Sequence, residues 1–221
     1  MSNRVVLVSD PDGDPDEGAL VEFRLTYEGP LLGASRSNTR AKHKHEIRKR
    51  FHRQLKRVWH EMPHFTEETQ GPPILTLGGK PFPDHDLESL AERYARNGYR
   101  FVPIVTDPLQ IMCGLDILFL RSEPPGAIFR SGDIDNRLKT LFDALRLPMN
   151  GDELGGYTAP DDDENPFFCL LEDDRLISKV SVETDTLWEP VKEIPSANDA
   201  RLVITVRLKP YLLNVKNMHF G

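Results

Sequence analysis

One segment of the chain restricts the fold more than any other. Residues 109–120, LQIMCGLDILFL, are apolar on both faces of an extended strand. A strand with two apolar faces is typical of the centre of a sheet, where other strands and a packed layer cover it. The sequence therefore predicts a sheet with this segment as a central strand.

Further segments predict the elements around that strand. Alternating apolar and polar residues predict strands over 21–29 and 200–210. Residues 99–105 are also expected to be extended, and residues 170–188 are expected to form a turn that enters a strand. Apolar residues at helical spacing predict helices over 40–62, from about Asp86 to Asn97, and over 131–145, with Gly98 ending the second. No regular alternation of strand and helix is present, so we expect one α+β domain over residues 1–221, with a mixed sheet and helices packed on it.

Composition indicates a cytoplasmic protein without a membrane-spanning segment. The chain carries a net charge of −7, and no apolar stretch approaches the length of a membrane span. Cys113 and Cys169 lie among apolar neighbours without the spacing of a metal site. We expect buried free thiols in a reducing compartment.

The charge is unevenly distributed. Residues 36–57 contain ten Lys or Arg and one Glu, a local charge of +9, so the rest of the chain carries −16. The helix over 40–62 should bury Ile47, Phe51, Leu55, Val58, Trp59 and Met62 and should project Lys42, Lys49, Arg53 and Lys56 to the opposite side. Most charged helix faces are merely solvated, but nearly unmixed positive charge favours contact with DNA phosphates. The histidines near this helix are expected at the surface.

The helix over 131–145, SGDIDNRLKTLFDAL, combines an apolar face with unexplained polar residues. Leu138, Leu141, Phe142 and Leu145 form the apolar face, whereas Asp133 and Asp135 stand where the helix begins. Helix capping and surface ion pairs along Asp135, Lys139 and Asp143 are one interpretation. Capping, however, accounts for one aspartate and not for two.

A second acidic cluster, Glu172-Asp173-Asp174, precedes a predicted strand. Carboxylates from separate elements can converge on a hard cation such as Mg²⁺ or Mn²⁺. Near a phosphodiester such a cation activates a water molecule, and a lysine neutralises developing charge. Asp133, Asp135 and Asp174 as metal ligands, with Lys139 beside them, would supply these parts.

The segments GDIDNRLKTLFDAL and EDDRLI together resemble the RusA-type Holliday junction resolvases. The shared pattern is D-x-D-N-x-x-K, then D-A-L, then an aspartate pair leading into a strand. The resemblance implies a RusA-like fold and a Mg²⁺-dependent homodimeric endonuclease that cuts four-way DNA junctions. It implies catalytic roles for Asp133, Asp135, Lys139 and Asp174, and it covers about residues 131–145 and 171–185.

The resemblance leaves alternatives open. The chain could be a catalytically silent member of this fold that binds nucleic acid or protein, or an unrelated phosphohydrolase acting on small phosphate esters. An acidic insert over about 147–169 should repel phosphate. We expect the insert to be mobile or partner-dependent, because its turn-rich composition offers little to bury.

Overall fold

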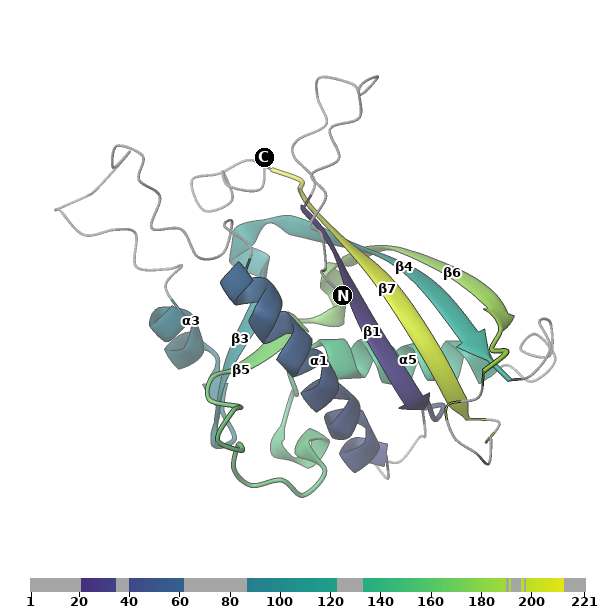
Figure 1. Ribbon diagram of the computed structural model, residues 1–221. Coiled ribbons are helices and arrows are strands. Elements are labelled where there is room, and N and C mark those ends of the chain that lie inside the picture. Colours follow the sequence, from purple (N-terminus) through teal and green to yellow (C-terminus); the bar gives the residue numbers. More distant parts are fainter. Residues whose placement is uncertain are drawn as a thin grey trace, which may run out of the picture.

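The computed structural model describes residues 21–34, 40–61, 87–122, 133–189, 191, 196 and 198–212. In this part of the chain, two mixed sheets and three α-helices share one hydrophobic core, as the predicted α+β class requires (Figure 1). The predicted helix limits at Met62 and Asp86 lie outside the described residues. No helix within the described ranges is long and apolar enough to cross a bilayer.

The larger sheet has four strands in the order β1-β7-β4-β6. Their bounds are Val21–Pro30 for β1, Ile111–Arg121 for β4, Ile177–Thr186 for β6 and Asp199–Pro210 for β7. The strand β4 is antiparallel to β7 on one side and parallel to β6 on the other. The prediction of a central strand is therefore confirmed, although the second face of β4 is only half-buried.

The smaller sheet contains β2 (Ala95–Arg96), β3 (Tyr99–Val105) and β5 (Phe167–Leu171). Asn97 and Gly98 form a two-residue turn between β2 and β3, with φ of 52° and 82°. The prediction that a helix continues to Asn97 and ends at Gly98 is wrong, since α3 spans only Leu87–Arg93. Asn-Gly favours a tight hairpin because both residues tolerate the left-handed backbone region.

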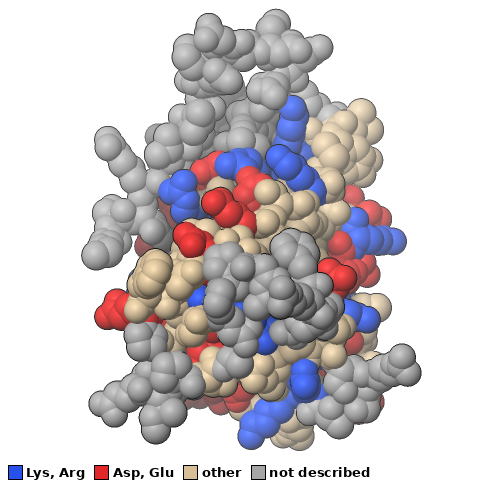
Figure 2. Space-filling view, turned by 90° about the vertical axis from the view of Figure 1, so that its right-hand side faces the viewer, with Lys and Arg blue, Asp and Glu red and all other residues tan. Residues whose placement is uncertain are grey.

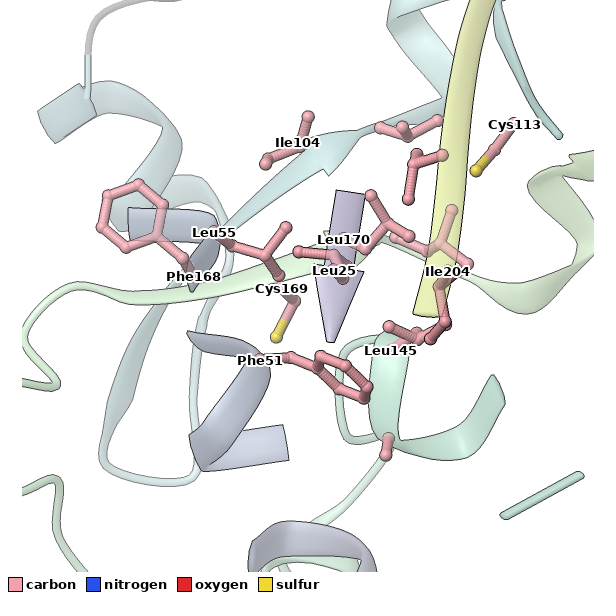
Figure 3. Packing of buried hydrophobic residues seen from close by; sticks show 14 of the residues in the cluster. Leu25, Phe51, Leu55, Ile104, Cys113, Leu145, Phe168, Cys169, Leu170 and Ile204 are labelled. Carbon is pink, nitrogen blue, oxygen red and sulfur yellow. The ribbon is translucent and has the colours of Figure 1, made fainter. Parts of the chain in front are cut away.

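The helices α1 (Ala41–Glu61) and α5 (Asp133–Leu145) complete the core (Figure 1). The predicted apolar face of α1 is confirmed at Ile47, Phe51, Leu55 and Trp59, which are buried, whereas Val58 is half-buried and Met62 lies outside the described residues. Figure 3 shows Phe51 and Leu55 near Cys169 of β5 and Leu25 of β1. Cys113 and Cys169 are buried free thiols, and burial raises the pKa of each to about 12.

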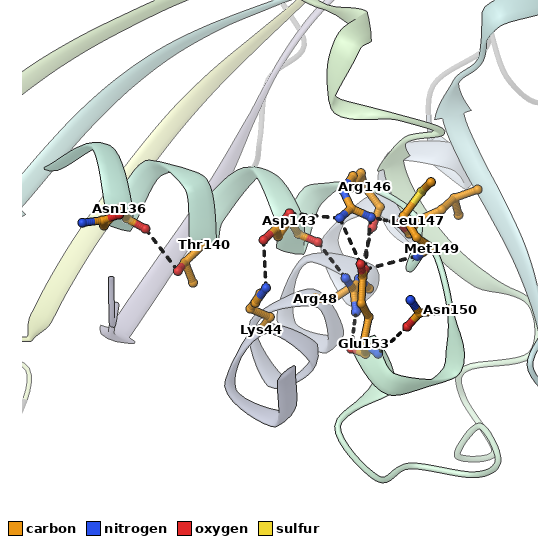
Figure 4. A network of polar contacts seen from close by, with 10 residues as sticks. All are labelled: Lys44, Arg48, Asn136, Thr140, Asp143, Arg146, Leu147, Met149, Asn150 and Glu153. Carbon is orange, nitrogen blue, oxygen red and sulfur yellow. Dashed lines mark hydrogen bonds and ion pairs between the residues drawn. The ribbon is translucent and has the colours of Figure 1, made fainter. Parts of the chain in front are cut away.

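A buried arginine joins α1 to the C-terminal end of α5. The guanidinium of Arg48 donates hydrogen bonds to the carbonyl oxygens of Asp143 (2.6 Å) and Arg146 (3.1 Å) (Figure 4). Asp143 lies in the last turn of α5, whose carbonyl groups have no partner within the helix, and Arg146 directly follows the helix. Arg48 therefore caps α5 from a neighbouring helix, although its own side chain is fully buried.

Carboxylates around Arg48 compensate the buried positive charge. Asp143 forms ion pairs with Lys44 (2.9 Å) and Arg146 (3.0 Å). Glu153, in the short helix η3 (Gly151–Leu154), accepts two hydrogen bonds from Arg146 (Figure 4). The network thus links α1, the end of α5 and η3 into one unit.

We predict that Arg48→Met lowers the free energy of unfolding by about 3 kcal/mol, because it leaves buried carbonyl groups without their donor and removes a positive charge near Asp143 and Glu153. Chemical denaturation measures this loss. The matched control is Arg57→Met on the exposed side of the same helix, which should change stability by no more than about 0.5 kcal/mol. Equal effects of the two substitutions would contradict the capping role.

Candidate functional site

Three of the four predicted catalytic residues lie on two elements that touch each other. Asp135 and Lys139 are on α5, and Asp174 begins the short helix η4 (Asp174–Leu176), which packs against α5. All three side chains are exposed. The structure thus leaves these three polar groups facing solvent on neighbouring elements.

The fourth residue, Asp133, is the first residue of α5, and its side chain is not among those that the structure describes. Among the described side chains, no group of three or more His, Cys, Asp or Glu residues is arranged to hold a metal ion. Because Asp133 is one of the three predicted ligands, the metal site stays a prediction.

The neighbours of Asp174 have structural roles. Glu172 accepts hydrogen bonds from the Tyr94 hydroxyl (3.1 Å) and from the Asp107 amide (2.9 Å). Asp173 caps η4 by accepting a hydrogen bond from the Arg175 amide (3.0 Å). Two members of the Glu172-Asp173-Asp174 cluster are therefore committed to the fold, and the remaining member is the one that the resemblance assigns to catalysis.

Asp143 is also structural, contrary to the interpretation of an exposed polar stripe along α5. Its carboxylate is buried against Lys44 and Arg146, and within the described residues no ion pair joins it to Lys139. The i, i+4 spacing alone did not distinguish a solvated aspartate from one that faces another helix.

The first half of α5 is fixed by residues that sequence reasoning missed. The buried guanidinium of Arg137 donates hydrogen bonds to the carbonyl of Leu31 (3.1 Å) and the side chain of Asn198 (3.3 Å). The amide of Ala34 donates to the carbonyl of Asn136 (2.7 Å). These contacts hold the part of α5 that carries Asp135 against the ends of β1 and β7.

Lys49, on the predicted DNA-binding face of α1, contacts the acidic insert instead of open solvent. The ammonium group of Lys49 lies 2.6 Å from Asp161 and 2.9 Å from Glu164, and also lies over the Tyr157 ring. Although burial alone lowers the pKa of Lys49, hydrogen bonds to both carboxylates raise it overall. The expectation that Lys49 projects away from the protein is wrong.

The other three predicted DNA-binding residues are more accessible. Lys42 and Arg53 are exposed, and Lys56 is half-buried. Arg53 approaches Asp163 at 3.7 Å, and Lys56 donates a hydrogen bond to the Asp163 carbonyl (2.8 Å). Their contact with DNA is untested and remains a prediction.

The acidic insert packs along α1 and so has more to bury than its composition suggests. Leu154 and Glu164 are buried, and the amide of Asp161 donates to the Glu164 carboxylate. A Cβ atom at Gly155, where φ is +65°, would overlap the backbone of Lys42, so glycine permits this close approach. The insert therefore has residues to bury, contrary to the expectation from its composition, whereas its mobility or dependence on a partner stays a prediction.

Two histidines of α1 are buried, which corrects the expectation of surface positions. His52 Nδ1 accepts a hydrogen bond from the Phe168 amide (2.8 Å), so Nε2 carries the proton and donates to the Asp163 carbonyl (3.1 Å). His45 Nδ1 accepts from Arg48 (3.2 Å). Burial lowers the pKa of His52 and lowers that of His45 to about 3, so both rings are neutral.

Scans of family models, curated proteins and solved structures found no match to this chain. The residues described above are therefore the basis for assigning a function.

We predict that Lys49→Met lowers the free energy of unfolding by about 2 kcal/mol, because the buried Glu164 carboxylate loses its cationic partner. Denaturant titration of the variant measures the change. Lys42→Met, at an exposed position of the same helix, should be nearly neutral. A neutral result for Lys49→Met would mean that the insert does not depend on this ion pair.

We also predict that acid destabilises the protein through His45. The folded-state pKa of His45 lies below the ordinary histidine value of 6.5. The contribution of this group to stability is therefore fully present above pH 6.5. It falls at lower pH, because the unfolded chain binds a proton there that the folded protein does not bind. The loss between pH 7 and 5 should be about 2 kcal/mol for this group.

The test is the pH dependence of unfolding in His45→Gln, which keeps an acceptor for Arg48 and should flatten the curve. His60→Gln, on the exposed side of α1, leaves both buried rings in place and serves as the control. An unchanged pH dependence in His45→Gln would contradict the prediction.

Proposed function

We propose that the protein is a metal-dependent DNA endonuclease of RusA type. The observation that carries the proposal is that the acidic residues on and next to α5 and η4 fall into two groups, one used by the fold and one exposed to solvent. Asp143, Glu172 and Asp173 are used by the fold, whereas Asp135, Lys139 and Asp174 are exposed on two touching elements. The exposed residues are the ones that the RusA-type pattern assigns to catalysis.

The chemistry of these residues fits hydrolysis of a phosphodiester. Asp133, Asp135 and Asp174 offer the oxygen ligands that Mg²⁺ or Mn²⁺ prefers. When bound, such an ion lowers the pKa of an attacking water molecule and stabilises charge on the leaving oxygen. Lys139 would neutralise the phosphate or the charge that develops on it.

The basic residues of α1 favour a polymeric substrate over a small phosphate ester. Arg53 and Arg57 are exposed on one face of the helix, beside Lys56. A small ester would need no such extended positive surface, whereas a DNA backbone presents phosphates in series. The substrate we propose is branched DNA, including the four-way junction.

A homodimer and a cytoplasmic location complete the proposal. A four-way junction has approximate two-fold symmetry, and paired cuts need two active sites, so a C₂ dimer suits the substrate. Both cysteines are unpaired and buried, which suits a reducing compartment.

The test is cleavage of labelled four-way, flap and linear duplex DNA with Mg²⁺ or Mn²⁺. We expect cleavage of branched DNA that EDTA abolishes. Asp135→Asn and Asp174→Asn should each lower the cleavage rate by roughly 10²-fold or more, since each would remove a ligand oxygen. Both positions are exposed, so the variants should unfold as the wild-type protein does.

The matched control is Asp152→Asn, an exposed carboxylate on η3, which should cleave at the wild-type rate. DNA binding without cleavage under any metal condition would favour the catalytically silent alternative. Equal loss of activity in Asp152→Asn would show that general negative charge, and not the proposed ligands, matters.

A further inference from the structure

A basic recess lies on the outer face of the C-terminal half of α1. It has a volume of about 380 Å³ and is lined by Arg53, Lys56, Arg57, His60 and their neighbours His52, Glu61 and Asp163. The first four residues are spaced i, i+3, i+4 and i+7, so they lie on one side of the helix. The recess therefore gathers several donors on a rigid element.

One residue of the acidic insert enters this recess. The Asp163 carbonyl accepts hydrogen bonds from Lys56 (2.8 Å) and His52 (3.1 Å), and its carboxylate stands 3.7 Å from Arg53. Side-chain exposure is 70% for Arg53 and 56% for Asp163. An ion pair this exposed and this long adds little stability, so another anion can take its place at low cost.

The ion pairs of Lys49 differ from this one in burial. Side-chain exposure is 12% for Lys49 and 3% for Glu164, and the two atoms are 2.9 Å apart. Displacing Glu164 would leave a buried charge without a partner, which is strongly unfavourable. The insert thus neutralises Lys49 permanently, whereas the basic residues that line the recess remain able to exchange their partners.

We propose that this recess binds a phosphate group of the DNA backbone and that the Asp163 carboxylate competes with that phosphate. The inference rests on the proposed function, because it names a surface that would hold the DNA substrate and that is made of residues other than the predicted catalytic ones. Arg53 and Arg57 provide the charge, since a guanidinium matches the oxygens of a phosphate. Lys49 takes no part.

The face of the molecule on the β6 side has a different character. Acidic and basic side chains are interspersed over it (Figure 2). Mixed signs are typical of a solvated surface. The recess also contains the acidic residues Glu61 and Asp163, but its basic residues, Arg53, Lys56 and Arg57, outnumber them. The excess of positive charge in the recess is what a phosphate requires.

The test measures binding of a four-way junction by the full chain in EDTA, across a series of KCl concentrations. Arg53→Gln with Arg57→Gln should weaken binding and lower the slope of log K against log salt by roughly 0.9 for each lost contact. Asp163→Asn, which keeps the backbone carbonyl, should tighten binding. Lys49→Gln should leave the slope unchanged.

The control for loss of charge is Arg24→Gln, at an exposed position of β1 that is not among the residues lining the recess, which should retain the wild-type slope. If the wild-type protein binds but the Arg53 and Arg57 double variant keeps its affinity and slope, the recess is not a phosphate site. The recess is equally excluded if Arg24→Gln lowers the slope to the same extent, or if the wild-type protein does not bind. Binding through the recess without cleavage in Mg²⁺ would instead overturn the proposed function alone.

Discussion

The buried guanidinium of Arg48 is the interaction on which the arrangement of the helices depends. A charged group without water is strongly unfavourable unless hydrogen bonds and opposite charges surround it. Arg48 obtains these from the carbonyl groups that end α5 and from the nearby Asp143 and Glu153. Because those carbonyls exist only where α5 ends, the contact fixes the position of α5 along its own axis. Lys139 and Asp135 lie about one and two turns before Asp143 on the same helix, so their placement follows from it.

Much of the fold was predictable because its elements have strong local patterns. The alternation over β1 and β7 and the long apolar run of β4 follow directly from which side chains face the core. The prediction failed at Asn97-Gly98, where a hairpin turn was taken for a helix end. The contacts of the acidic insert with α1 were not predicted either, because its composition resembles that of a solvated loop. Its Asp161 and Glu164 pair with Lys49, which is 112 residues from Asp161 in the chain and could not be assigned as a partner from composition.

The residue types of the candidate site were predictable from the sequence, but which of its aspartates support the fold and which face solvent was not. The sequence offers aspartates at 133, 135, 143, 173 and 174, and spacing alone does not separate those that support the fold from those that face solvent. The separation comes from tertiary partners such as Arg146 for Asp143 and the η4 amide for Asp173. Arg137, which anchors α5 to Leu31, carried no signal in the sequence beyond its position within the helix.

The packing of the insert on α1 means that substitutions in these two segments, which are distant in the sequence, affect each other. Lys49 and Glu164 neutralise each other within the protein, so a change of sign at either position leaves two like charges in contact. Related chains should therefore alter these positions together, or replace both with apolar residues of similar volume. Gly155 adds a steric condition, because any side chain there would overlap Lys42. We therefore expect the length and register of the insert to be constrained by its contacts with α1, so that it tolerates fewer insertions and deletions than a free surface loop.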